Sequence, residues 1–560
     1  MNADFWNDKR PAGVDSSIDL TAYRSVVEVF DRSCERFAQR PAFSNLGVTL
    51  DYAQLQAHAR AFAGWLQQHT SLRPGDRIAI QMPNVLQYPI AVFGALLAGL
   101  VVVNTNPLYT VREMRHQFKD AGVRALVYLN LFGDKVEQVL DDTDIEFLIE
   151  ARMGDLLPAP KSWLVNLLVA KVKKMVPLYH LPQAVRFRQV LHAQLQAVAV
   201  AVGQDDTAVL QYTGGTTGQA KGAMLTHGNL IANMLQVQAC FSQRGEGGER
   251  MIEPGQEVMI APLPLYHVYA FTANCMCMMA SGNHNVLITN PRDIGGFIKE
   301  LKKWRFTGLL GLNTLFVALM DHPQFSSLDF SSLKVTNSGG TALSTATAER
   351  WEALTGCRIV EGYGLTETSP VACANPYGPS AQLGSVGIPL PGTAVKVIDD
   401  QGVELALGER GELCIQGPQV MKGYWNNPQA SADTLDSDGW LKTGDIAIIS
   451  SDGFVRIVDR KKDMIIVSGF NVYPNEVEEV VMGHPNVASC AAIGVADSRT
   501  GEAVKLFVVP RGAGLDLEEL KQFCKANLTG YKVPHQIVLR ESLPMTAVGK
   551  ILRRELRDEG

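Results

Sequence analysis

The chain has 560 residues, 46% of them hydrophobic and 19% charged, with a net charge of −6 at pH 7. This length exceeds what a single hydrophobic core supports, so we expect at least two domains. The acidic balance excludes a protein whose main ligand is nucleic acid, because binding a phosphate backbone requires a basic surface.

The cysteines and the N-terminus indicate a cytoplasmic protein. Nine cysteines, an odd number, are scattered along the chain and do not form the dense framework of a small secreted domain. Cys275 and Cys277 are a close pair without a second pair nearby, so we expect structural cysteines rather than zinc ligands. The first residues, MNADFWNDKRPAG, carry charges where a signal peptide needs an apolar core.

Short apolar runs alternate with helix-like stretches over roughly the first 380 residues. Examples are RIAIQM at 77–82, ALVYL at 125–129 and VMIAPLPL at 258–265. Such alternation is typical of parallel sheets covered by helices, so this part is predicted to be α/β. Residues 383–459 change to short β segments separated by glycine-rich turns, which predicts a small barrel or β-rich subdomain. The residues after DRKKD, 459–463, read as a separate α+β domain.

Two stretches raise the question of a membrane. Residues 78–111 carry no charge before Arg112, but their most apolar part, Ile90 to Val103, is too short to span a bilayer. We expect a buried helix that leads into a buried strand. Residues 162–180 combine Trp and Leu with several lysines. This basic amphipathic stretch either lies in the plane of a bilayer surface or packs as a surface helix on its own domain.

A glycine-rich stretch, YTGGTTGQAKG at 212–222, lies between a predicted strand and a predicted helix. Glycine lets backbone N–H groups approach an anion, and threonine hydroxyls and Lys221 add further donors. The stretch is not a Walker loop, because Ala220 precedes the lysine and Gly222 follows it. A nucleotide or another polyphosphate is the expected ligand, with a flexible turn as the alternative.

Two later stretches add groups suited to nucleotide chemistry. In EGYGLTETS, 361–369, Tyr363 can lie against a planar ring, and Glu367 is a hard oxygen ligand suited to Mg²⁺. DGWLKTGD ends in Asp445, whose carboxylate can accept hydrogen bonds from both hydroxyls of a ribose. Helix or turn caps are the alternative roles for the two carboxylates.

Two cations complete the set. Arg460 follows Asp445 by fifteen residues and can join the same sugar or its phosphate. Lys550 follows a glycine turn in PMTAVGKILRREL, on the predicted C-terminal domain. A solvated surface charge is the alternative for this lysine.

These motifs, in this order, resemble the adenylate-forming superfamily of acyl-CoA synthetases, luciferases and peptide-synthetase adenylation domains. Residues 438–462, DGWLKTGDIAIISSDGFVRIVDRKK, are similar to the signature segment of fatty acyl-CoA synthetases. The resemblance implies an α/β fold with a large N-terminal domain, residues 1–459, built from two α/β sheets and a small β-barrel. It further implies a hinge at 460–463 and a mobile, smaller α+β domain at 464–560.

The resemblance also implies a reaction. A long-chain fatty acid attacks the α-phosphorus of ATP to give acyl-adenylate and pyrophosphate, and coenzyme A then takes the acyl group, for fatty acid degradation. Mg²⁺ is the expected metal. The alternatives are a medium-chain or aryl acid-CoA ligase, or a fatty acyl-AMP ligase that loads a free-standing carrier protein. Contact with the cytoplasmic face of the inner membrane and assembly as a homodimer stay open.

Site residues follow from the same resemblance. The catalytic set is Lys550 between the fatty carboxylate and the α-phosphate, Thr366 at the α-phosphate, Glu367 at the metal, and His267 near the carboxylate end of the acyl pocket. For His267, a core histidine is the alternative. The β- and γ-phosphates are assigned to Thr213, which also serves as a metal ligand, and to Gly214, Gly215, Thr216, Thr217, Gly218 and Lys221. Adenine is assigned to Gly339, Gly340, Thr341, Glu361, Gly362, Tyr363 and Gly364. Ribose is assigned to Asp445 and Arg460, domain rotation to Lys462, and thioester formation to the loop around Gly469.

Overall fold

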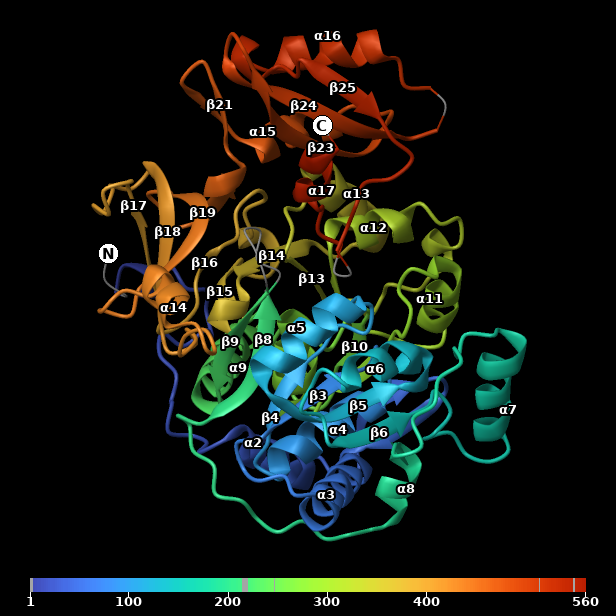
Figure 1. Ribbon diagram of the computed structural model, residues 1–560. Coiled ribbons are helices and arrows are strands. Elements are labelled where there is room, and N and C mark those ends of the chain that lie inside the picture. Colours follow the sequence, from blue (N-terminus) through green and yellow to red (C-terminus); the bar gives the residue numbers. More distant parts are fainter. Residues whose placement is uncertain (1–3, 214–219, 246, 513, 547–548, 560) are drawn as a thin grey trace.

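The computed structural model describes residues 4–213, 220–245, 247–512, 514–546 and 549–559. Within this part of the chain, the strands form two large sheets, one small antiparallel sheet and one sheet near the C-terminus (Figure 1). The mixed α/β architecture confirms the predicted fold class.

The first large sheet has seven strands in the order β7-β6-β5-β3-β4-β8-β9. Neighbouring strands are parallel except for β8 and β9. Strands such as VRALVYL are almost completely buried, as expected where helices cover both faces of a parallel sheet. The strands are β3 (Arg77–Gln81), β4 (Val101–Asn104), β5 (Val123–Leu129), β6 (Phe147–Ala151), β7 (Val185–Arg186), β8 (Thr207–Thr213) and β9 (Lys221–Thr226).

The second large sheet has nine strands in the order β16-β15-β14-β13-β12-β10-β11-β1-β2. Its centre is parallel, and antiparallel strands close both edges. The strands are β1 (Pro41–Asn45), β2 (Val48–Asp51), β10 (Val258–Ala261), β11 (His284–Leu287), β12 (Gly308–Gly311), β13 (Val335–Gly339), β14 (Ile359–Gly364), β15 (Val371–Ala374) and β16 (Ile388–Pro389).

Helices pack against these two sheets, and apolar side chains of helices and strands together form the hydrophobic cores. Every residue of α4 is buried, and β4 follows it, so the uncharged stretch at 78–111 is the predicted buried helix and strand. None of the described helices combines the length and apolar character needed to cross a bilayer. The larger helices are α2 (Val26–Arg36), α3 (Tyr52–His69), α4 (Gln87–Leu97), α5 (Val111–Ala121), α6 (Gly133–Leu140), α9 (His227–Phe241), α11 (Ile294–Leu301), α12 (Asn313–Met320) and α13 (Thr345–Thr355).

The predicted β-rich segment forms a four-stranded antiparallel sheet in the order β17-β18-β19-β20, with the short helix α14 (Pro428–Thr434) beside it. The expectation of a barrel needs correction in one respect. Among the described residues no strand ladder joins the edge strands, and four short strands are too few to curl into a closed barrel. The strands are β17 (Ala394–Ile398), β18 (Arg410–Gln416), β19 (Leu441–Ile449) and β20 (Val455–Arg460).

The C-terminal sheet and its helices lie at one end of the molecule, above the two large sheets in Figure 1. Apolar residues of α15, α16 and the sheet form a separate core that includes Val477, Val481, Leu520 and Cys524. The strands are β21 (Ile465–Val467), β22 (Phe470–Val472), β23 (Val487–Asp497), β24 (Gly501–Pro510) and β25 (Gln536–Leu539), and the helices are α15 (Pro474–Met482), α16 (Leu517–Asn527) and α17 (Arg553–Asp558).

Candidate active site

The glycine-rich stretch connects two antiparallel strands. β8 ends at Thr213 and β9 begins at Lys221, and these two residues are partners in the ladder. A helix was predicted directly after the loop, whereas β9 comes first and α9 begins at His227. Gly214, Gly215, Thr216, Thr217 and Gly218 lie outside the described residues. The Lys221 ammonium lies 5.1 Å from the centre of the Tyr424 ring, a cation–π distance.

A carboxylate, a phenol and a guanidinium meet where β14, β19 and β20 approach one another. Asp445 and Arg460 face each other in the β19–β20 ladder, with 3.7 Å between Arg460 Nε and Asp445 Oδ1. The Tyr363 hydroxyl donates to Asp445 Oδ2 over 2.6 Å. Burial raises the pKa of Asp445, and the charge of Arg460 and the bond from Tyr363 oppose that rise. The fifteen-residue spacing therefore places both predicted ribose residues at one point.

Glu367 lies beside this cluster in a single 3₁₀ turn, Thr366–Thr368. The Tyr424 hydroxyl donates to Glu367 Oε1 over 2.6 Å, and the Met421 backbone N–H donates to the Glu367 carbonyl oxygen. Tyr424 thus links the Lys221 strand to the turn that carries Glu367. Tyr424 was not among the predicted site residues, because its segment has no periodic pattern or motif that would single it out.

The ends of β13 and β14 provide a glycine-lined surface next to these carboxylates. Gly339 and Gly362 are ladder partners, and Gly340 follows with a φ of 84°, in the region that favours glycine. Gly364 also needs its hydrogen side chain, because a Cβ there would overlap the Pro370 carbonyl oxygen. The Oγ1 atom of Thr341 is buried without a hydrogen-bond partner among the described residues.

Glu361 is the buried carboxyl of this surface. Burial raises the pKa of Glu361 to about 7, although the Leu343 backbone N–H, 3.4 Å from its Oε2, acts in the opposite direction. Glu361 therefore has both donor and acceptor capacity near neutral pH.

Lys550 reaches this surface from the C-terminal part of the chain. Its Cε atom lies 3.6 Å from the position that a Cβ would take on Gly340. Burial, together with the charge of Arg460, lowers the pKa of Lys550 to about 8, while Asp445 and Glu367 act in the opposite direction. The lysine that is most distant in sequence thus faces the predicted adenine, ribose and metal residues.

His267 lies close enough to Lys550 for the charge of the lysine to act on its ring. Its Nδ1 accepts from the Tyr269 backbone N–H over 3.3 Å and caps the short helix α10 (Val268–Ala270). Burial and the positive charge of Lys550 lower the pKa of His267 to about 3. The ring is therefore neutral at physiological pH, and it combines the predicted position near the site with the capping role of a structural histidine.

Comparisons with known proteins identify the family of this chain. A model of the AMP-binding enzyme family matches residues 30–425, and a model of the AMP-binding enzyme C-terminal domain matches residues 476–550. The chain belongs to the AMP-binding enzyme family. It is 50% identical to a long-chain-fatty-acid–CoA ligase of Salmonella typhimurium and 48% identical to one of Haemophilus influenzae, in each case over 99% of this chain and 98% of the relative. ATP-bound MatB from Rhodopseudomonas palustris superposes with a TM-score of 0.79 at 26% identity, covering 95% of this chain and 98% of that chain.

The segment between the family's two matched regions carries ion pairs on either side of Lys462. Lys461 Nζ lies 2.9 Å from Asp400 Oδ1 and 3.1 Å from Glu412 Oε2. On the other side, Asp463 Oδ1 accepts from Arg557 over 2.7 Å. Lys462 itself is exposed between these two anchored neighbours.

Two hydrogen bonds from Asn475 cross the same segment, one of them from its side-chain amide to the Val458 carbonyl oxygen over 3.2 Å. The buried Asp459 Oδ2 accepts from the Asn475 backbone N–H at the start of α15, over 2.7 Å. It ties the small β-sheet to the C-terminal helices.

Gly469 is the predicted site residue that the structure leaves apart from the others. It lies in the hairpin between β21 and β22 with a φ of 82°, and no described atom lies within 4 Å of the position of a Cβ. The hairpin belongs to the C-terminal sheet, so any contact between Gly469 and the cluster would require the two parts of this family member to move.

Proposed function

We propose that the protein is a long-chain fatty acid-CoA ligase that works through an acyl-adenylate. The observation that carries the proposal is the position of Lys550 beside Gly340, Asp445 and Glu367, in a chain that is similar over its full length to curated long-chain ligases. The carboxylate of the fatty acid attacks the α-phosphorus of ATP and pyrophosphate leaves. The thiol of coenzyme A then attacks the acyl carbon, and AMP departs.

The residues around Lys550 suit the first step. In-line attack of one anion on another needs neutralised charge and fixed orientation more than a proton acceptor. Lys550 would bridge the two reacting groups, and the hydroxyl of Thr366 would contact the α-phosphate. Support comes from the lack of a triad-like pairing at His267, whose Nδ1 accepts from a backbone N–H.

The nucleotide would lie across the glycine surface. Gly339, Gly340 and Gly362 leave room for a planar base, and Glu361 and the unpartnered Thr341 hydroxyl provide hydrogen-bonding groups at its edge. Asp445 and Arg460 would hold the ribose hydroxyls. Thr213, the following loop and Lys221 would receive the β- and γ-phosphates. This placement gives the orphaned Thr341 Oγ1 the partner that buried hydroxyls normally have.

Magnesium fits the same arrangement. The described residues contain no group of three or more His, Cys, Asp or Glu side chains that could enclose a metal ion. Mg²⁺ is usually held by one or two protein oxygens together with substrate phosphates and water, so Glu367 and the Thr213 hydroxyl are a sufficient donor set. When bound, the ion would neutralise charge on the triphosphate.

In the second step, the thiol of coenzyme A would have to approach through the space that Lys550 fills. We propose that residues 464–560 rotate relative to residues 1–459 about the hinge 460–463, with Lys462 as its centre. The rotation would remove Lys550 and bring the loop around Gly469 to the acyl-adenylate. The anchored neighbours of Lys462 support this assignment, because they leave one residue free between two fixed ones.

The substrate is a fatty acid that enters degradation after activation, and the membrane is a natural source of such an acid. We therefore also propose that the protein works at the cytoplasmic face of the inner membrane, which it contacts without crossing.

The deciding experiment is thioester formation with coenzyme A across saturated acids from short to long, with benzoate and cinnamate as aryl controls. Long-chain acids should give the highest kcat/KM. A maximum at short or aryl acids would overturn the substrate class. Release of pyrophosphate without any CoA thioester would instead favour an acyl-AMP ligase that serves a carrier protein.

A further inference from the structure

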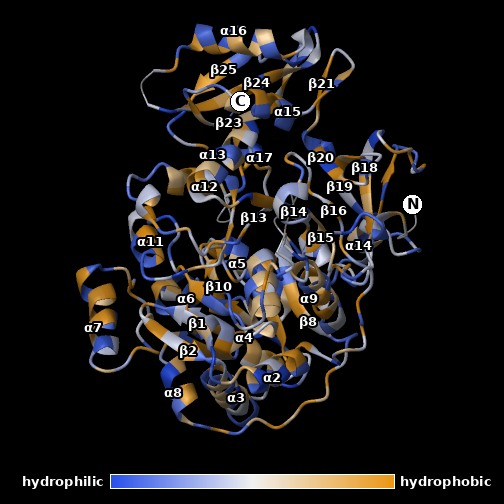
Figure 2. Ribbon diagram, turned by 180° about the vertical axis from the view of Figure 1, so that it is seen from behind, coloured by the Kyte–Doolittle hydropathy of each residue, from blue (hydrophilic) through white to orange (hydrophobic). Residues whose placement is uncertain are grey.

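A short helical segment projects from the side of the N-terminal part of the molecule (Figure 1). It consists of α7 (Lys161–Leu167) and a following π-helical turn, Leu168–Val172. Figure 2 shows that much of its ribbon is hydrophobic and that it stands away from the body of the protein. The exposed apolar side chains of the segment are Trp163, Leu164, Leu167, Leu168, Val172 and Met175.

The polarity of this segment is the reverse of that of an ordinary surface helix. Ser162 is buried, and Asn166 Oδ1 accepts from the Gly154 backbone N–H over 2.8 Å, so the polar side faces the protein. On the outer side, Trp163 is 64% exposed and Val172 is 68% exposed. A helix packed on its own domain through its apolar side would bury these side chains. The segment is packed on its domain by its polar side, and its apolar face is open to a partner.

The body of the protein holds the segment at both ends. The Lys161 ammonium donates to the Leu46 carbonyl oxygen over 3.0 Å. Beyond the segment, the Tyr179 hydroxyl donates to Glu150 Oε2 over 2.8 Å. The chain on both sides of the apolar face is therefore fixed to the body of the protein.

The charge of this region indicates the kind of partner. Although the whole chain has a net charge of −6, the stretch between Asp155 and Asp205 contains no Asp or Glu. It contains six basic residues: Lys161, Lys171, Lys173, Lys174, Arg186 and Arg188. Exposed apolar groups surrounded by like positive charge suit an anionic bilayer. They do not suit a second copy of the chain, because a symmetric contact would bring the same charges together.

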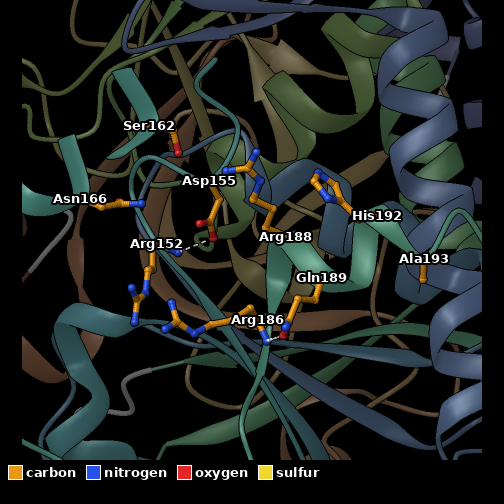
Figure 3. Close-up of a pocket in the computed structure, with 9 residues that line it drawn as sticks. All are labelled: Arg152, Asp155, Ser162, Asn166, Arg186, Arg188, Gln189, His192 and Ala193. Atoms are coloured by element: carbon orange, nitrogen blue, oxygen red, sulfur yellow. Dashed lines mark hydrogen bonds between the residues drawn. The ribbon is translucent and has the colours of Figure 1, made fainter. Parts of the chain in front are cut away.

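A polar pocket of about 520 Å³ lies at the base of the segment, between α7 and the helix α8 (Phe187–His192). Figure 3 shows Arg152, Arg186 and Arg188 around it. Glu150 pairs with the first two, at 2.9 Å from Arg152 Nε and 3.4 Å from Arg186 Nη1.

Arg188 is different from the other two arginines. It is exposed and has no ion pair or hydrogen bond to the described part of the chain. An unpaired guanidinium at the mouth of a pocket is suited to bind a phosphate in a bidentate manner.

We propose that residues 161–178 and the Arg188 pocket form a docking surface for an anionic phospholipid bilayer. Trp163, Leu167 and Val172 enter the boundary between head groups and acyl chains. Lys173 and Lys174 lie at the level of the head groups, and Arg188 binds a lipid phosphate. The proposal rests on the proposed function for its purpose, which is to take a water-insoluble acid from the membrane, and it names the surface that makes this contact.

The test is flotation of the full-length protein with vesicles of phosphatidylcholine alone or mixed with phosphatidylglycerol. The protein should float with the anionic vesicles, and raising the salt to about 0.5 M should weaken the binding. Because each lysine near an anionic surface contributes about 1 kcal/mol, Lys173→Ala should lower the vesicle affinity about fivefold. Arg188→Ala should have an effect of the same size on binding to the anionic vesicles.

Matched control variants lie elsewhere on the surface. Val172→Ser should weaken flotation, whereas Val403→Ser, at a position of 59% exposure, should not. Lys525→Ala is the control for Lys173→Ala, because both lysines are exposed and Lys525 lies in α16. All variants should keep wild-type thioester formation with a water-soluble short acid in the absence of vesicles.

Three outcomes would overturn the proposal: no flotation of the unaltered protein, equal flotation with both vesicle types, or a dimer in solution that Val172→Ser dissociates. Failure of the proposed function gives a different result. In that case vesicle binding and its loss in the variants would persist while no acid yields a CoA thioester.

Discussion

The substitution Lys550→Ala tests the assignment of the two half-reactions most directly. In the described conformation the lysine lies against Gly340, and the charges of Asp445 and Glu367 act on its ammonium group. Removing a single donor aimed at charge that develops in a transition state slows reactions by about 10²–10³. Pyrophosphate release should fall by that factor. Conversion of supplied acyl-adenylate to thioester should stay within about threefold of wild type, because this step does not use the lysine.

The same residue predicts a pH dependence. Burial and Arg460 lower the pKa of Lys550 from 10.5 to about 8, and the charged form is the active one. The value of kcat/KM for ATP reports on the free enzyme. For adenylation this value should therefore decline as pH rises through about 8. At pH 9 roughly one tenth of the plateau should remain. In kcat the decline should move to higher pH, because bound triphosphate favours the charged lysine.

Lys550→Arg is the matched control, since a guanidinium stays charged throughout this range. It should retain part of the activity and lose the decline near pH 8. The assays are pyrophosphate release for the first step and thioester formation from acyl-adenylate for the second. Equal loss of both half-reactions in Lys550→Ala, or a decline near pH 8 that persists in Lys550→Arg, would refute the reasoning.

Two further substitutions test the hinge and the ribose cluster. Lys462→Pro fixes φ at the one exposed residue between two anchored neighbours. Thioester formation should therefore fall at least about tenfold, while pyrophosphate release in a first turnover changes little. An equal loss in both measurements would contradict the hinge. Tyr363→Phe removes the donor 2.6 Å from the buried Asp445 carboxylate. Loss of such a bond is worth about 1–3 kcal/mol, so the KM for ATP should rise about tenfold with the fatty acid KM unchanged, and an unaltered KM for ATP would separate this pair from nucleotide binding.

The α/β character of the first 380 residues could be predicted because buried parallel strands are short, apolar and spaced by helices. The separate C-terminal unit could be predicted from a change of pattern after residue 463. Strand β9 was missed, because KGAMLT is short and its place in the sheet depends on pairing with β8, which no local pattern reveals. The barrel was predicted from turn spacing and from the family resemblance, and neither of these determines whether the edge strands meet.

Some contacts of the site could likewise be predicted from the sequence, and others could not. Asp445 and Arg460 are close in sequence, and their contact follows from an ordinary β-hairpin. Lys550 and Gly340 are 210 residues apart, and nothing in either segment predicts that they meet; the expectation came from resemblance to a family. Tyr424 could not be found at all, because its role depends on reaching Glu367 from an irregular segment.

The bond between Asp459 and Asn475 contributes to the free-energy difference between the domain arrangement for adenylation and the one for thioester formation. If residues 464–560 turn about Lys462 while the ion pairs of Lys461 and Asp463 stay closed, this buried bond is among those that must open, together with the bond from Asn475 Nδ2 to the Val458 carbonyl oxygen. A hydrogen bond to a charged group contributes about 1.5–3 kcal/mol. The Asp459 bond alone would therefore hold the second arrangement to about one molecule in ten to one in a hundred or slightly less. Differential binding of ATP or acyl-adenylate to the two arrangements is then enough to select between them, so the order of the two reactions can be set by occupancy of the site without an external signal.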